Sequence, residues 1–452
     1  MRKRGALLLA AIPLTAMTVL LLVWAVDERR AATRLRGEID RIQAAGQPLG
    51  NGSLNTWLAR TASSEGSRAW AEVIGLGDPE FLNLVDLDRL PVIGYATLPA
   101  EIDPDADWEH EADVAEALRW MGPVIERIDE ATDYPTPVWQ PIDFRGYDTL
   151  LPEVRSARGI NRLLQLEVEH SLYHRDAERA LRGLESMRVA ADAFDWQICM
   201  VVDLVRSALV RVHQAMIRRS LSIDLWDEQQ LQALAAQVSG APDIGPRWRN
   251  VIAGERAIMF QTISDGDSMA RAFGDTRHPT VAPLLKAIVA LPSVREAILG
   301  DYREAISLGD GGIDHLTSRA AAWQERLQTK LGQRKLAPAN VLRGLILPGF
   351  EPYAISLRRL EDDRRLTRVA LAIKRFQLRH GEWPADLSRL SDIGLTSSEW
   401  STVERENFGF EAIADAAYVW GHHLSEVGTI PATRPRIDKD KDAAFQQFAK
   451  IR

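Results

Sequence analysis

The sequence predicts a mainly α-helical protein with three parts: an N-terminal transmembrane helix, a repeat-like body of helical hairpins, and a small α+β segment at the C-terminus. Three observations predict this fold class. Residues 5–26 form an uninterrupted apolar run, residues 153–350 carry apolar side chains at helical spacing, and short alternating stretches appear only after residue 400. The expected regions are 1–30 (cytoplasmic tip and anchor), 31–152 (juxtamembrane helix and an irregular Pro/Trp-rich part), 153–350 (helical body) and 351–452 (C-terminal helix and hairpin).

The apolar run of residues 5–26 is long enough to cross a membrane. At 1.5 Å per residue, roughly 22 helical residues reach about 33 Å, which matches a hydrocarbon core of about 30 Å. The alternative is a cleavable signal peptide, because Val23 and Ala25 occupy the positions that a signal peptidase prefers. The length of the run and the interfacial Trp24 favour a membrane anchor.

The flanking charges indicate the orientation of this anchor. Arg2, Lys3 and Arg4 precede the run and favour a cytoplasmic N-terminus. Arginines also follow the run, but they are interleaved with acidic residues such as Asp27 and Glu28. We therefore expect the bulk of the chain outside the cytoplasm.

Composition limits the classes of partner. The formal net charge of the 452-residue chain is -8, and it is more negative still without the basic tip, so nucleic acid is not an expected partner. Cys199 is the single cysteine, which excludes an intramolecular disulfide. Its apolar neighbours predict a small buried side chain rather than a reactive thiol.

The region 31–152 begins with a helix that continues from the anchor to the glycine- and proline-rich stretch 46–52. Prolines then divide the chain into short pieces, including an expected helix over 112–121. Five tryptophans in this region either cover the core beneath long loops, which we favour, or line a groove: Trp57, Trp70, Trp108, Trp120 and Trp139.

The region 153–350 is predicted to consist of helices with turns between them. Apolar faces from Ile160 to Leu172 and from Ala177 to Val189 indicate a hairpin with its turn at 174–176. The small residues Ala177 and Ala180 make its second helix resemble that of a tetratricopeptide-type hairpin. Further helices are expected over 196–220, 226–238 (capped within 222–224), 248–263, 281–291, 293–308 and 317–331.

The C-terminal region begins with an amphipathic helix over 356–379. Gly381 is suited to the left-handed position that ends a helix, and Pro384 to the start of a short helix carrying Leu387 and Leu390. Residues 408–410 and 417–420 are expected to form a small strand hairpin.

This C-terminal stretch resembles the helix-to-loop segment of type II secretion pseudopilins over residues 366–390. The matching positions are Ala372, Ile373, Phe376, Gly381, Trp383, Pro384, Leu387 and Leu390. The order of anchor, helical middle and tail is similar to a group of uncharacterised membrane-anchored helical proteins of bacteria. The resemblance implies a single-pass protein of the bacterial inner membrane with a periplasmic body and a protein partner in the cell envelope. It does not imply fibre assembly, because the apolar run lacks a glutamate and the segment lies far downstream of it.

One histidine pair has the spacing of a metal site. His170 and His174 lie four residues apart on one helical face, as two imidazoles that share a metal do. Glu167 and Glu169 are nearby, but no His-Glu-x-x-His string completes a site, so these histidines are only weak candidates for metal ligands.

Two other patterns are weaker still. His422 and His423 would point to opposite faces of a strand. Acidic residues alternate at 438, 440 and 442 as in an EF-hand, but Ala443 and Ala449 replace the required glycine and glutamate, so a solvated charged run is expected.

No motif for a catalytic nucleophile or a cofactor is present, so we expect no catalytic residues and no cofactor. The leading hypothesis is a non-enzymatic, membrane-anchored helical scaffold or partner-binding protein. The alternatives are a hydrolase-like envelope enzyme, with a site assembled from distant residues such as His110, His170, His174 and His422, or an accessory component of a secretion apparatus.

Overall fold

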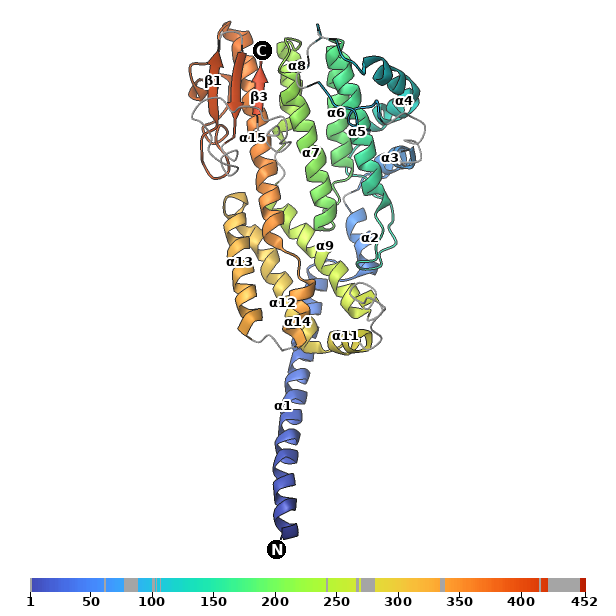
Figure 1. Cartoon of the computed structure of the whole chain (residues 1–452), viewed down its shortest axis with the longest axis vertical. Helices are drawn as coiled ribbons and strands as arrows, with labels where there is room; N and C mark the ends of the chain where they lie inside the picture. The colour runs from blue at the N-terminus through green and yellow to red at the C-terminus, as the bar shows by residue number, and fades with distance from the viewer. Residues whose placement is uncertain are drawn as a thin grey trace.

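The computed structural model describes residues 2–60, 62–76, 88–99, 102, 104–105, 107–240, 243–265, 268–269, 281–333, 338–413, 416–421 and 448–452. Within these ranges, the description of side chains leaves out residues 2–16, 281–282, 284–285, 333, 338–339, 341, 345 and 448. The chain is mainly helical in this part, with one small antiparallel sheet near the C-terminus, as the sequence predicts (Figure 1).

The helices and strands follow one another in this order: α1 Arg2–Ala44, α2 Asn51–Ala59, α3 Ser64–Leu76, α4 Glu111–Thr132, α5 Pro152–Tyr173, α6 Ala177–Ala193, α7 Met200–Ser220, α8 Glu228–Ser239, α9 Ile244–Ser264, α11 Val281–Val289, α12 Pro292–Ser307, the 3-10 helix η2 Leu308–Gly311, α13 Ile313–Gln333, α14 Pro338–Ile346, α15 Phe350–His380, the 3-10 helix η3 Leu387–Ile393, β1 Gly409–Ile413, β2 Ala416–Trp420 and β3 Phe448–Ile451.

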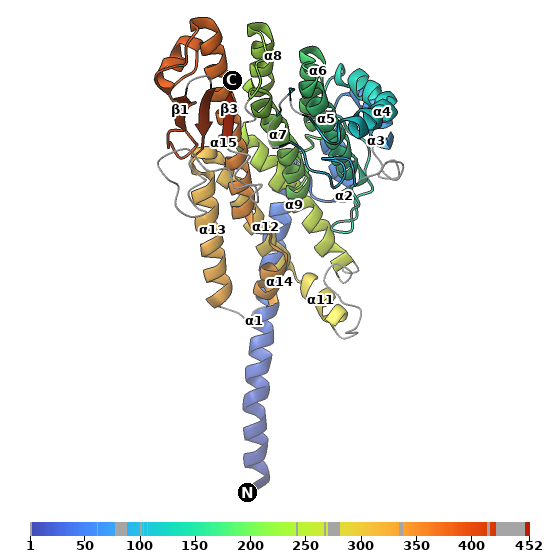
Figure 2. The same ribbon diagram turned by 45° about the horizontal axis from the view of Figure 1, so that its top comes forward.

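Helix α1 is continuous, but its two halves have different surroundings. The N-terminal half projects alone from one end of the body, whereas the C-terminal half lies against it (Figures 1 and 2). Contact with the body begins at Glu28, which accepts hydrogen bonds from the backbone N–H (3.1 Å) and the hydroxyl (2.5 Å) of Ser293 at the start of α12. Further along, Glu38 pairs with Arg303 of α12 at 2.6 Å, and Ala31 and Ile42 are buried.

The predicted transmembrane span over residues 5–26 is not supported by the structure. Among the described residues, no helix meets the length and hydropathy expected of a membrane-crossing segment.

The body is organised around two hydrophobic clusters that the long helix α15 joins. The first cluster contains apolar side chains of α2 to α8, the C-terminal half of α15 and the sheet. The second contains side chains of α9, α11 to α14 and the first turns of α15. The first cluster extends from Leu54 to Ile451 and therefore crosses the predicted region boundaries at 152 and 350. The division into regions itself stays a prediction.

The predicted hairpin is confirmed as α5 and α6, which pack side by side (Figure 1). The side chain of Asp176 accepts the N–H of Arg179 and begins α6 at the expected turn. The predicted cap of the next helical pair at 222–224 is wrong. Helix α8 begins after Asp227, because Asp227 and Gln230 form a reciprocal capping box there.

Two helix predictions were too short. Helix α4 runs through Pro123 to Thr132, where the sequence predicts only 112–121. The loss of one backbone hydrogen bond at the proline is offset by the burial of Val124, Ile125 and Ile128 beyond it. Helix α15 likewise begins six residues before the predicted start, and α14 was not predicted.

The tryptophans of the irregular region mostly belong to the core. Trp70, Trp108 and Trp139 are buried and Trp57 packs partly buried against them, which confirms the core interpretation for these four side chains. Trp120 is an exception, because 60% of it is exposed.

The C-terminal segment has the predicted helix end and hairpin. Gly381 adopts φ +72° and ends α15, and the buried Leu387 and Leu390 lie on η3. Strands β1 and β2 pair antiparallel with Gly409 opposite Trp420. Strand β3, which the sequence did not predict, pairs with the other edge of β2, and the backbone of Arg452 then bonds to Leu221 at 2.9 Å.

Candidate functional site

The predicted histidine pair lies at the end of α5, and the structure adds a third side chain to it. Glu111, the first residue of α4, directs one carboxylate oxygen at both imidazoles. Its Oε1 lies 3.4 Å from His170 Nε2 and 3.0 Å from His174 Nε2. The two imidazole rings are tilted by 55° with centroids 4.4 Å apart.

Local packing brings α4 to this place. The ring of Trp108, just before α4, meets the ring of Tyr173 edge-to-face at 5.4 Å. Tyr173 in turn contacts the ring of His174, which caps α5. The aromatic contacts therefore hold the first turn of α4 over the last turn of α5.

The cluster is partly open to solvent. His170 and Glu111 are 23% and 29% exposed in their side chains, and His174 is 47% exposed. Partial burial lowers the pKa of His170, and the neighbouring His174 lowers it further, while the Glu111 carboxylate opposes both effects. His170 is therefore held toward its neutral form, which is the form that binds metals.

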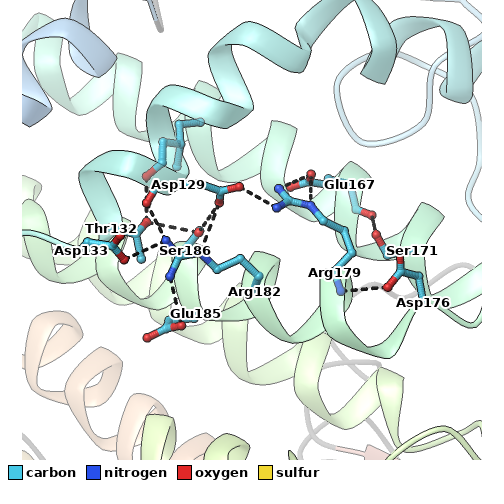
Figure 3. Close-up of polar contacts among 11 residues, drawn as sticks. Asp129, Thr132, Asp133, Glu167, Ser171, Asp176, Arg179, Arg182, Glu185 and Ser186 are labelled. Carbon is cyan, nitrogen blue, oxygen red and sulfur yellow. Dashed lines mark hydrogen bonds and ion pairs between the residues drawn. The ribbon is translucent and has the colours of Figure 1, made fainter.

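The two glutamates that the sequence placed near the histidines have other partners. Glu167 accepts a hydrogen bond from Arg179 at 2.6 Å, and Glu169 accepts one from Arg219 at 2.6 Å. Figure 3 shows Arg179 between Glu167 and Asp129, whose carboxylate it also meets at 2.6 Å. These interactions join α4, α5, α6 and α7, so Glu167 and Glu169 belong to the packing between these helices and not to the histidine cluster.

His110, another histidine of the proposed enzyme site, does not join the cluster. His110 is adjacent to Glu111 in sequence, but its Nδ1 lies 4.0 Å from Asp113. His422 and His423, and the acidic run 438–442, lie outside the described residues.

A separate polar cavity lies where α6, α7, α8 and α15 meet. Its volume is about 150 Å³, and its lining includes Arg206, His213, Gln214 and Arg364. His213 Nε2 donates a 3.0 Å hydrogen bond to Gln237 Oε1, and burial lowers the pKa of His213 to about 4, so it is neutral at pH 7. This cavity contains no residue that the sequence had singled out.

Cys199 is buried, as predicted, at the N-cap of α7. Burial and, to a smaller extent, the nearby Glu255 raise the pKa of its thiol to about 12. A thiol of this kind is not a nucleophile at neutral pH.

The projecting half of α1 is a second candidate functional feature. Eight apolar side chains between residues 17 and 26 are 46% to 69% exposed: Met17, Val19, Leu20, Leu21, Leu22, Val23, Trp24 and Val26. Because they include six consecutive residues, they cover every side of the helix.

Comparison with known proteins gives no match, whether to a family model, to a curated protein or to a solved structure. The pseudopilin resemblance of residues 366–390 therefore stays a prediction.

Proposed function

We propose that this protein is a membrane-anchored scaffold, in which the N-terminal half of α1 lies in a bilayer and carries a helical body for binding a protein partner. The observation that carries this proposal is the exposure of apolar side chains on all sides of the projecting helix. A helix that is apolar all round requires an apolar environment, and the body covers none of these side chains.

The change in surroundings along α1 supports the proposal that lipid surrounds its N-terminal half. The last apolar residue of the run, Val26, is exposed, and Glu28, two residues later, is already bonded to Ser293. The apolar run of residues 5–26 therefore ends where contact with the body begins. Its length of about 33 Å as a helix matches the hydrocarbon core of a bilayer rather than a protein groove.

The orientation proposed from the sequence places the body outside the cytoplasm of a bacterial cell, in the periplasm. The basic residues at positions 2–4 support this orientation. Added protease is expected to degrade the body in spheroplasts, and protection of the body there would contradict the orientation.

Anchoring is tested with two matched double variants of the full chain expressed in bacteria. Met17→Lys with Leu20→Lys places two ammonium groups on the projecting half, where each costs about 3 kcal/mol at the centre of a membrane helix. Thr33→Lys with Asp40→Lys places two on exposed positions of the packed half.

The wild type and the second variant should stay in the membrane pellet after carbonate extraction, and the first variant should be released with an unchanged melting temperature. The anchor is refuted if carbonate releases the wild type, or if the first variant stays in the pellet as firmly as the second.

A further inference from the structure

The cluster of Glu111, His170 and His174 brings three metal-binding side chains together from two helices. One ligand atom from each side chain lies within 4.8 Å of the other two. We infer that these three residues form a binding site for a divalent transition metal ion of the zinc class. This inference goes beyond the proposed anchoring and does not depend on it.

The distances in the cluster are close to those around a tetrahedral ion. With metal–ligand bonds of about 2.0–2.1 Å and tetrahedral angles, neighbouring ligand atoms are about 3.3–3.4 Å apart. Glu111 Oε1 lies 3.4 Å from His170 Nε2, which is this length, and 3.0 Å from His174 Nε2, which is slightly shorter. The third edge joins the two imidazoles across one helical turn, where the ring centroids lie 4.4 Å apart.

The ligand types select the ion. Two imidazoles and one carboxylate suit zinc and its neighbours, whereas Ca²⁺ and Mg²⁺ prefer sites built from oxygen. Three protein ligands leave a fourth coordination position, which solvent can reach because His174 is 47% exposed. The site therefore has the composition of an open zinc site rather than of a closed structural one.

The competing explanation is a hydrogen-bonded cluster without metal. Here Glu111 Oε1 accepts a hydrogen bond from the Nε2–H of each imidazole, and the charge of Glu111 interacts favourably with the N-terminus of α4. The two explanations differ in one measurable respect, because only a metal site gains stability when zinc is added.

The test uses the full-length protein in detergent, freed of metal with a chelator, and Zn²⁺ alone as the probe. Zinc binding is measured by competition with a chromophoric chelator, and thermal unfolding is recorded with and without zinc. The variants are Glu111→Gln, His170→Gln and His174→Ala. The matched control is His315→Ala, which removes an exposed histidine from α13.

The wild type and the control should bind one zinc per chain and melt at a higher temperature with zinc. Each of the three variants should bind zinc at least about tenfold more weakly, since even the outer partners of metal ligands contribute this much. Affinity should fall as the pH is lowered, because an imidazole binds a metal ion only in its neutral form. Co²⁺ bound to the wild type should show the intense visible absorption of a four-coordinate ion.

The inference is overturned if the wild type binds no zinc, or if Glu111→Gln binds zinc as tightly as the wild type. Because His174 is a half-exposed cap residue, His174→Ala is the variant least able to disturb folding. Unchanged zinc affinity in a folded His174→Ala protein would refute the site on its own.

Discussion

Glu255 is a buried carboxyl on α9 that makes stability depend on pH. Its side chain accepts the backbone N–H of Met200 at 3.1 Å, and among the described residues no cation forms an ion pair with it. Its surroundings include the thiol of Cys199 and the hydroxyls of Tyr147 and Tyr302. Burial raises the pKa of Glu255 from 4.5 to about 7, although the bond from Met200 opposes this.

The sign and size of the effect follow from this pKa. Below pH 4.5 the carboxyl is neutral in both the folded and the unfolded chain, so it has no ionisation penalty. Between pH 4.5 and 7 the carboxyl is ionised in the unfolded chain but still protonated in the folded one, so the free energy of unfolding falls by about 3 kcal/mol, at about 1.4 kcal/mol per tenfold change in the dissociation constant; above pH 7 both forms are ionised and the loss is complete.

The substitution Glu255→Gln keeps an acceptor for the Met200 N–H but cannot ionise. It should leave stability nearly unchanged at pH 4.5 and raise it by about 3 kcal/mol at pH 8. With an unfolding entropy of about 2.1 cal/mol/K per residue, this corresponds to about 3 °C in melting temperature for a chain of this length.

The assay compares thermal unfolding of wild type and variant between pH 4.5 and 8, so that all other titrating groups cancel. Glu126→Gln, on the exposed face of α4, is the control and should parallel the wild type. A difference between wild type and Glu255→Gln that stays constant across this pH range would refute the reasoning.

Three further substitutions test the packing, each through the melting temperature. Arg179→Ala should destabilise the protein by about 3 kcal/mol, because it leaves the carboxylate of Glu167, which is 9% exposed, without its cation. Arg179→Lys should cost less, and equal losses in the two variants would contradict the paired geometry. In Gly254→Ala the Cβ would lie 1.9 Å from Ile198 O, so the steric cost should exceed the roughly 1 kcal/mol that alanine gains in helix propensity, and the protein should be destabilised. In Gly300→Ala the Cβ would have open space around it, so this substitution should stabilise the protein by up to about 1 kcal/mol. A Gly254→Ala protein as stable as the wild type would show that the contact with Ile198 is absent. Asp227→Ala removes the capping box of α8 and should cost about 1 kcal/mol, and no loss would mean that the cap does not act in solution.

Long periodic segments of the sequence predicted their helices well, and short segments were predicted less consistently. The faces of α5 and α6 repeat over about five turns, so the hairpin and its turn were visible without any tertiary information. Helix α11, with nine residues, was predicted, whereas helix α14, also with nine, and strand β3, with four, were not. The sequence predicts a helix end before Pro123, but the apolar residues beyond it pack into the core and keep α4 helical.

The sequence predicted two of the three residues of the candidate metal site. His170 and His174 share a helical face, and this spacing follows from local geometry alone. Glu111 is 59 residues from His170, and only the packing of α4 on the hairpin brings it there. The nearer glutamates were misleading, because Glu167 and Glu169 lie on buried faces of α5 that meet Arg179 and Arg219. Sequence proximity was therefore a poor guide to the third ligand.

The two proposed features lie at different ends of the molecule, which makes them separable by experiment. Helix α1 projects from one end of the body, and α4 lies with the α5–α6 turn in the part farthest from it (Figures 1 and 2). On the membrane-anchored proposal, the cluster of Glu111, His170 and His174 would face away from the bilayer, where zinc reaches it from solution. Lysines at positions 17 and 20 should therefore release the protein from membranes without changing its zinc affinity. Glu111→Gln should weaken zinc binding while the protein stays in the membrane pellet. If one substitution abolished both properties, it would have unfolded the body, because no direct contact joins the two places.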